Sequence, residues 1–172
     1  IAVPLGTALG LAAAWFGGWV DSTINWLYTV VASIPDILLI TAISYALGKG
    51  MATMCIALAA TSWISAMRLV RGDVLKHKAL TYVDAARAIG ATPLYILWRQ
   101  ILPNVLHVVV VVGTLTLVTA IKAEVVLTYL GLGIQEGTSW GLIITAAAQD
   151  LANHVWWPLA ATVLAMFALI YS

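Results

Sequence analysis

Few side chains of this sequence could do chemistry, and three of them stand inside otherwise apolar stretches. They are Asp36, Lys122 and Glu124. A charge at the centre of a membrane helix costs about 2.5–3.5 kcal/mol on insertion scales, so such residues face a polar path or pair with other side chains. Lys122 and Glu124 are two positions apart and do not face each other on a helix. We expect all three to be candidates for a translocation path, with structural pairing as the alternative for Glu124.

The remaining reactive residues do not form a catalytic or metal-binding pattern. His77, His107 and His154 share no metal-ligand spacing, and the single Cys55 excludes an intrachain disulfide. The sequence also lacks the G-x-x-x-x-G-K-[ST] loop that cradles ATP phosphates. An intramembrane enzyme would need a nucleophile with its base, paired aspartates or a metal motif within the apolar stretches. We therefore predict a non-enzymatic chain with no catalytic residue, no metal and no cofactor.

The amino-acid composition indicates what kind of structural element carries these residues. Hydrophobic residues make up 63% of the 172 positions, charged residues only 9%, and the mean hydropathy is +1.02. A soluble domain needs about a quarter of its residues charged. Long apolar runs without period-two alternation favour membrane helices, which satisfy their own backbone hydrogen bonds. The predicted fold is all-α, a polytopic transmembrane helical bundle in a lipid bilayer.

The apolar stretches predict five spans, at about 1–18, 24–47, 51–70, 104–133 and 155–172. The second contains Pro35, which removes one backbone hydrogen bond, so we expect a kinked helix there. Asp36 then faces the bundle interior or a polar cavity.

Lysine and arginine concentrate in the connection at 71–103, which the positive-inside rule places in the cytoplasm. The turn at 48–50, the connection at 134–154 and the first residue then fall outside. The chain accordingly reads as a fragment that lacks an earlier span. Lys78, among the charges of this connection, is expected to matter little.

The cytoplasmic connection contains the signals of two short helices. Thr81 and Asp84 match a capping box, and Gly90 supplies a left-handed stop after Ile89. A second helix opens at Thr92 and Pro93, and we expect it to run through Gln100 and to end at Pro103. The alanines at 85, 86 and 88 cluster around one turn of the first helix and permit a close approach to a partner.

The spacing within this connection is specific. Asp84-Ala85-Ala86, Gly90 and Leu102-Pro103 fall at the positions of E-A-A-x3-G-x9-I-x-L-P, a pattern that resembles the EAA loop of ABC importer permeases. Asp84 stands for the usual glutamate, and Gln100 occupies the isoleucine position.

Further stretches at 17–21, 33–35, 124–135 and 139–141 resemble the dipeptide, oligopeptide and nickel branch of that family. The resemblance implies one permease domain over 1–172, from a protein of roughly six spans, with 71–103 as its coupling loop.

The resemblance also implies partners and roles. Asp84, Ala85, Ala86, Gly90 and Pro103 would serve the fit to an ATPase rather than catalysis. The implied partners are two cytoplasmic ATP-binding subunits, a second permease subunit and an extracytoplasmic solute-binding protein, in a bacterial inner membrane.

Ser139 could cap a helix that runs through Gln149 in the outer connection. The binding protein would dock there, with Glu136 and Asp150 as candidate contacts, and the alternative is a re-entrant or surface helix that only covers the bundle.

The substrate stays open among peptides, nickel and related solutes. A channel or structural membrane protein without an ATPase is the alternative function. Nucleic-acid binding is disfavoured because the second short helix, around Tyr95 and Trp98, is mostly apolar.

Overall fold

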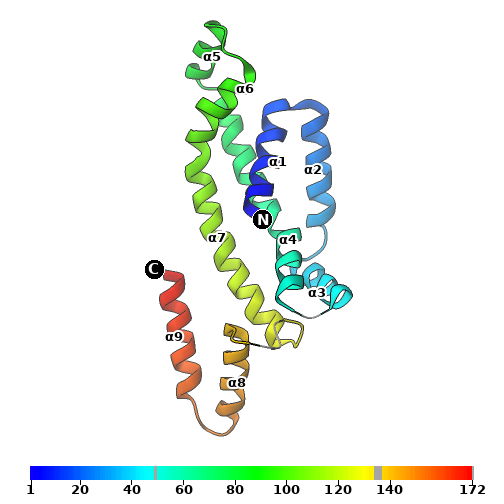
Figure 1. Ribbon diagram of the computed structural model, residues 1–172, viewed down its shortest axis with the longest axis vertical. Coiled ribbons are helices and arrows are strands. Elements are labelled where there is room, and N and C mark those ends of the chain that lie inside the picture. The colour runs from blue at the N-terminus through cyan, green and yellow to red at the C-terminus, as the bar shows by residue number, and fades with distance from the viewer. Residues whose placement is uncertain (49, 134–136, 172) are drawn as a thin grey trace. The chain divides into compact units, whose positions relative to one another are not determined.

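The computed structural model describes residues 1–48, 50–133 and 137–171, and every regular element in these ranges is a helix (Figure 1). In chain order the elements are α1 (Ala2–Phe16), α2 (Gly18–Ala32), α3 (Asp36–Leu47), α4 (Met51–Lys78), α5 (Thr81–Ala88), α6 (Pro93–Tyr95), the π-helix η1 (Ile96–Ile101), α7 (Leu102–Tyr129), α8 (Trp140–Ala152) and α9 (Trp157–Tyr171). The predicted all-α class is therefore confirmed. Lys49 of the predicted outer turn and the candidate contact Glu136 lie outside the described residues.

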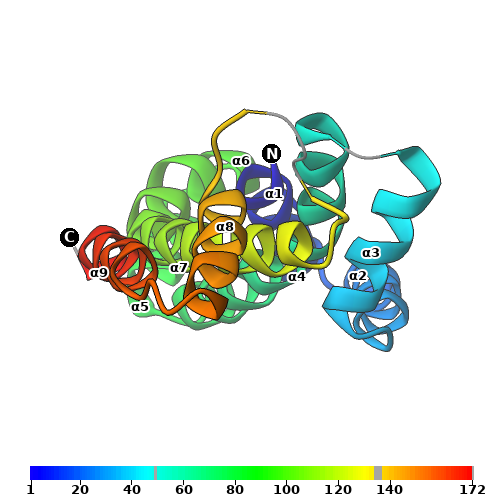
Figure 2. The ribbon, with the colours of Figure 1, turned by 90° about the horizontal axis from the view of Figure 1, so that it is seen from below.

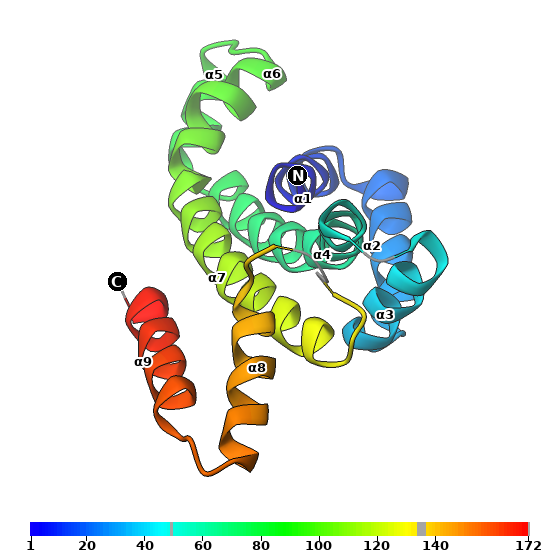
Figure 3. The same cartoon turned by 60° about the horizontal axis from the view of Figure 1, so that its bottom comes forward.

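The chain divides into two compact units, one of residues 1–35 and 59–116 and one of residues 36–58 and 117–172. In the first unit α1 and α2 form an antiparallel pair, and α1 also lies beside α4 (Figures 1 and 3). Buried side chains of α4 around Trp63, Ile64 and Met67 form one core of this unit. A second core joins α1 and the end of α4 to the segment that follows α4.

Two glycines let α1 approach α4 closely. A Cβ atom on Gly6 would lie 2.6 Å from Cβ of Ala66, and one on Gly10 would lie 2.6 Å from the carbonyl oxygen of Met67. Any side chain at either position would therefore push the two helices apart. Gly6 and Gly10 are four residues apart on one side of α1, the small-xxx-small arrangement that allows membrane helices to pack backbone to backbone.

The predicted kinked second span is instead two helices with a break at 33–35. The N–H of Ser33 donates to the carbonyl oxygen of Thr29 at 3.0 Å, and the N–H of Ile34 donates to that of Val31 at 3.2 Å. These bonds close α2. Pro35 has no N–H to continue the ladder and disfavours helical geometry at the residue before it. The α-helix therefore stops, and α3 begins anew at Asp36.

By length and composition, two helical segments could cross a membrane, namely Met51–Lys78 and Pro93–Tyr129, and the broken pair of α2 and α3 adds a third if it counts as one span. The first and last predicted spans correspond to α1 and α9, apolar helices of 15 residues each. A straight crossing takes about 20 residues. Helix length alone thus supports two or three of the five predicted spans.

In the second unit, α8 and α9 form an antiparallel pair (Figures 1 and 2). The buried core of this unit joins Ile40 of α3, Met54 and Ala57 of α4, and Leu127 of α7. Ser139 begins α8 as predicted, because its hydroxyl accepts a hydrogen bond from the N–H of Leu142 at 3.1 Å. The helix ends at Ala152.

Candidate functional site

The candidate site is the hairpin between α4 and α7, residues 79–101, which we call the coupling hairpin. It starts later than the predicted connection, because α4 continues as helix through Lys78. The predicted capping box is wrong. Leu80 is the N-cap of α5 and makes no side-chain cap hydrogen bond, while Thr81 is already helical. The Asp84 carboxylate instead accepts a hydrogen bond from Nη1 of Arg87 at 2.9 Å on the exposed side of α5.

Gly90 ends α5 as predicted. Its φ of +82° lies in the left-handed region that favours glycine. The N–H of Gly90 donates to the carbonyl oxygen of Arg87, and the N–H of Ala91 donates to that of Ala86, each at 3.0 Å. This pair of bonds is a Schellman motif, which satisfies carbonyl groups of the last helical turn. The turn is therefore fixed in shape.

The second arm of the coupling hairpin begins as predicted and ends differently. The Thr92 hydroxyl accepts a hydrogen bond from the N–H of Tyr95 at 3.3 Å, and Pro93 occupies the first helical turn. The helix does not stop at Pro103, because α6, η1 and α7 form one continuous helical segment from Pro93 to Tyr129. A proline inside a helix removes one hydrogen bond and collides with the preceding turn. The π-helical turn just before Pro103 widens that turn, so the segment continues.

The two arms of the coupling hairpin pack on each other through apolar side chains. Val83 and Ala86 of α5 are buried together with Leu97 and Ile101 of η1. Ala86 is 3% exposed, so it lies inside the coupling hairpin and not on its outer surface. Its small size serves the contact between the two arms.

The outer surface of the coupling hairpin combines small and large apolar residues. Ala85 and Ala88 are exposed on α5, and Ile89 is 85% exposed beside them. On the second arm Leu94 and Trp98 are also exposed, but their side chains face α1 across a pocket and do not belong to this outer surface. A large exposed apolar side chain beside small residues is typical of a surface that contacts another protein.

The side chain of His77 joins α4 to the coupling hairpin. Its Nδ1 lies 2.9 Å from the Tyr82 hydroxyl, and its Nε2 lies 3.7 Å from a carboxylate oxygen of Asp73. The Tyr82 phenol is protonated at neutral pH, as an ordinary tyrosine is, and burial raises its pKa further. The protonated phenol can donate to Nδ1. These side chains fix the angle at which α5 leaves α4.

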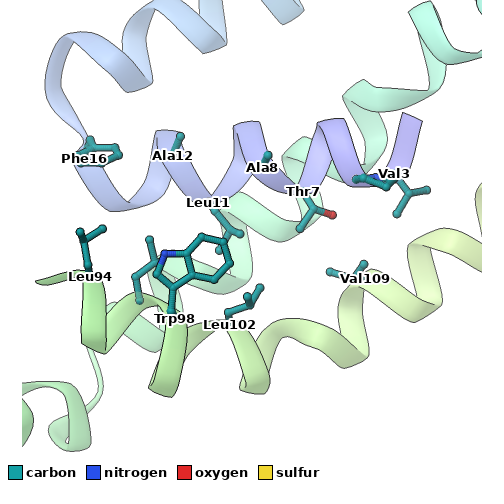
Figure 4. A pocket seen from close by; sticks show the side chains of 12 residues that line it. Val3, Thr7, Ala8, Leu11, Ala12, Phe16, Leu94, Trp98, Leu102 and Val109 are labelled. Atoms are coloured by element: carbon teal, nitrogen blue, oxygen red, sulfur yellow. The ribbon is translucent and has the colours of Figure 1, made fainter. Parts of the chain in front are cut away.

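A pocket of 540 Å³ lies between α1 and the segment from α6 to α7 (Figure 4). Apart from Thr7 and Trp98, the side chains labelled in Figure 4 carry no polar atom, and none carries a charge. The labelled lining consists of Val3, Thr7, Ala8, Leu11, Ala12, Phe16, Leu94, Trp98, Leu102 and Val109. Such a lining suits apolar groups and offers no charge with which to hold a peptide terminus.

The three charged residues within apolar segments differ in burial. Asp36 and Lys122 are exposed, and only Glu124 is buried. One carboxylate oxygen of Glu124 accepts from the Thr128 hydroxyl at 2.9 Å, and the other accepts from the N–H of Gly141 at 3.3 Å.

Gly141 lies in the first turn of α8, where free N–H groups and the helix dipole favour a negative charge. Structural pairing, the alternative we kept for Glu124, is thus what the geometry provides. Among the described residues, no group of three or more His, Cys, Asp or Glu side chains gathers where it could hold a metal ion.

The model of the family described as "Binding-protein-dependent transport system inner membrane component" matches residues 6–172. The chain belongs to this family. The match includes the coupling hairpin and both glycines of α1.

Named permeases resemble the chain over most of its length. It is 35% identical over 156 residues to the dipeptide transport system permease protein DppC of Bacillus subtilis, covering 90% of the chain and 49% of that protein. It is 37% identical over 158 residues to the glutathione transport system permease protein GsiD of Pectobacterium atrosepticum, covering 90% and 52%. Identity to the oligopeptide transport system permease protein OppC of Bacillus subtilis is 33% over 153 residues, covering 88% and 50%. The chain thus spans about half the length of these relatives.

Sequence reasoning missed two features of this chain. The glycine pair Gly6 and Gly10 has a readable signal, a G-x-x-x-G spacing inside an apolar stretch. The contacts made by Arg71 and Lys78 had no such signal, because Asp21 precedes Arg71 by 50 positions and Trp15 precedes Lys78 by 63. Only the fold brings these partners together.

Proposed function

We propose that this chain is the membrane-spanning permease subunit of an ATP-driven importer, and that the coupling hairpin docks on a cytoplasmic ATPase. The observation that carries the proposal is the exposed apolar surface at α5, formed by Ala85, Ala88 and Ile89. A short helix with a small-residue face fits a groove on a partner, the helix-in-groove mode of recognition.

Each residue that we assign to coupling then has a distinct task. Ala85 lies on the docking surface, and Asp84 lies beside it in its exposed pair with Arg87. Ala86 and Gly90 act from within, because one packs the two arms together and the other fixes the turn. Pro103, exposed at the start of α7, lies next to the π-helical turn, where the hairpin continues into a span.

The distribution of lysine and arginine supports the orientation that we propose for the chain in the membrane. The positive-inside rule favours a cytoplasmic coupling hairpin, with five crossings in this part of the protein. The short helices α1 and α9 would then cross with the help of interfacial side chains or local thinning of the bilayer. The proposed assembly has two ATP-binding subunits, a second permease subunit and an extracytoplasmic binding protein. The exposed Asp150 of α8 is a candidate contact for the binding protein.

We further propose a peptide-type substrate, since the relatives named above are permeases of dipeptide, glutathione and oligopeptide systems. A nickel substrate is the competing assignment within the family resemblance. Asp36 and Lys122 are exposed on this chain and are the proposed path residues, whereas Glu124 is engaged with α8. Binding of a labelled dipeptide, and not of nickel, to the partner binding protein would distinguish the two substrates.

The test of coupling places bulk and charge on the docking surface. In the reconstituted transporter, Ala85→Arg should leave the protein level unchanged but abolish substrate-stimulated ATP hydrolysis together with uptake, because the arginine holds α5 off its groove. Lys76→Ala is the matched control, since the Lys76 side chain is 79% exposed on α4, outside the docking surface. Uptake that survives Ala85→Arg would make the hairpin a mere connector and would favour the channel or structural alternative.

A further inference from the structure

The last two turns of α4 carry two sets of polar contacts that point to different neighbours. Arg71 and Lys78 are seven positions apart and therefore lie on the same side of the helix. Both contact the pair of α1 and α2. Asp73 and His77 are four positions apart, and this second set contacts Tyr82 of α5. The segment 71–78 thus touches the α1–α2 turn through one set and the coupling hairpin through the other.

Arg71 holds the first turn of α2. Its Nε and Nη2 donate to the two carboxylate oxygens of Asp21, each at 2.6 Å, and the Asn25 amide donates to the same carboxylate at 2.7 Å. The arginine and aspartate side chains are 29% and 24% exposed. A bidentate pair of this kind fixes orientation as well as distance.

Lys78 holds the last turn of α1. Its ammonium group donates to the carbonyl oxygens of Ala14 at 3.1 Å and Trp15 at 2.8 Å, and it lies 5.6 Å from the centre of the Trp15 ring. The last carbonyl groups of a helix lack partners within the helix, and the dipole there favours a positive charge. Lys78 therefore does not have the neutral role that the sequence suggested.

We propose that Arg71 and Lys78 are positioning residues that bind the α1–α2 turn to the base of the coupling hairpin, so that both move as one body. The proposal rests on the proposed function, because it gives α4 the task of passing hairpin movement into α1 and α2. Lys78 holds α1 just before the turn at 17–18 and Arg71 holds α2 just after it, so the turn cannot pivot on α4 about a single contact.

The first experiment uses the complete transporter, with its ATPase and binding-protein partners, in proteoliposomes. Arg71→Gln and Lys78→Met should each leave ATP hydrolysis running while the solute moved per ATP falls about five- to tenfold, the size of effect seen for residues along a coupling route. Lys78→Arg keeps the charge and should transport normally. Exchanging the charges, with Asp21→Arg and Arg71→Asp together, should recover part of the uptake lost in Arg71→Gln. Lys76→Met, two positions from Lys78, is the control, because the Lys76 side chain is 79% exposed and its ion pair, at 3.9 Å, is with Asp73 of its own helix.

Two results would overturn the proposal. One is an unchanged uptake per ATP in both Arg71→Gln and Lys78→Met. The other is a lower protein level with a normal uptake per ATP, which would show that the contacts serve stability alone. The hairpin variant Ala85→Arg separates this proposal from the proposed function. If Ala85→Arg abolishes uptake while Lys78→Met does not, only the one-body proposal fails, and if Ala85→Arg transports normally, the coupling function itself fails.

A distance measurement tests the proposal without relying on transport. Spin labels at Ser22→Cys and Arg99→Cys, both exposed positions, would report the separation of α2 and the coupling hairpin in a Cys55→Ser background. We expect one narrow distance distribution that is the same in the nucleotide-free and ATP-bound complexes, and a broad one in Lys78→Met. A distance that changes between the two nucleotide states in the otherwise unaltered chain would contradict the one-body proposal.

Discussion

The close packing of α1 on α4 gives a stability prediction whose size follows from the structure. A Cβ atom at Gly10 would lie 2.6 Å from the carbonyl oxygen of Met67, 3.1 Å from the N–H nitrogen of Arg71 and 3.2 Å from Cβ of Val70. Ordinary van der Waals contact begins near 3.4 Å, so Gly10→Ala forces a separation of about 0.8 Å. Overpacking of this kind costs about 1–3 kcal/mol.

Gly113→Ala is the control, because a Cβ on Gly113 of α7 meets no atom within 4 Å. Both variants gain about 1 kcal/mol of helix propensity from alanine, so their difference isolates the packing contact. We expect Gly10→Ala to be less stable than Gly113→Ala by about 2 kcal/mol, or about 4–8 °C in Tm for a chain of this size. Thermal unfolding in detergent, followed by circular dichroism, measures it. Equal Tm values for the two variants would refute the close approach of α1 to α4.

Other changes probe the hairpin, the buried carboxylate and the topology. Gly90→Val should destabilise the coupling hairpin by about 1–2 kcal/mol or more, because an L-residue resists the left-handed region, and faster proteolysis within 79–101 would report it. Ala86→Arg should raise hydrogen exchange across the same residues, since Ala86 is buried there, while equal protection in Ala86→Arg and Ala85→Arg would contradict that placement. Thr128→Val leaves Glu124 without its hydroxyl donor and should cost about 1–3 kcal/mol of unfolding free energy, whereas Thr114→Val, on the exposed side of α7, should change it by less than about 0.5 kcal/mol. A membrane-impermeant thiol reagent should label Lys76→Cys only from the cytoplasmic side and a cysteine placed within 134–138 only from outside, and the reverse pattern would overturn the topology.

Local signals in the sequence predicted local structure well. Thr92, Gly90 and Ser139 each act through backbone groups within a few residues, and each occupies the role that its residue type favours. The misplaced N-cap at Thr81 and the continuous helix through Pro103 each have a cause that lies outside the local sequence. Apolar packing between the two arms decides where helices begin and continue, and a π-helical turn absorbs the proline. Neither effect has a local signature.

The site was harder to predict than the fold. The spacing of Asp84, Ala85 and Ala86 marked the coupling hairpin, but only the structure separates the exposed Ala85 from the buried Ala86. The contacts of Glu124 with Gly141 and of Lys78 with Trp15 join residues 17 and 63 positions apart. Contacts at such separations depend on how helices pack, which a single sequence does not encode in any periodic pattern.

The central claim is that the outer surface of the coupling hairpin contacts an ATPase, and disulfide or short-linker crosslinking tests it most directly. In a Cys55→Ser background, Ala88→Cys on the exposed side of α5 should crosslink to a cysteine in the groove of the ATPase partner within the assembled transporter. Ala86→Cys, buried between the two arms, should not. Crosslinks to the ATPase from Ala88→Cys alone are the predicted result, and an assembled complex in which Ala88→Cys forms none would contradict the account.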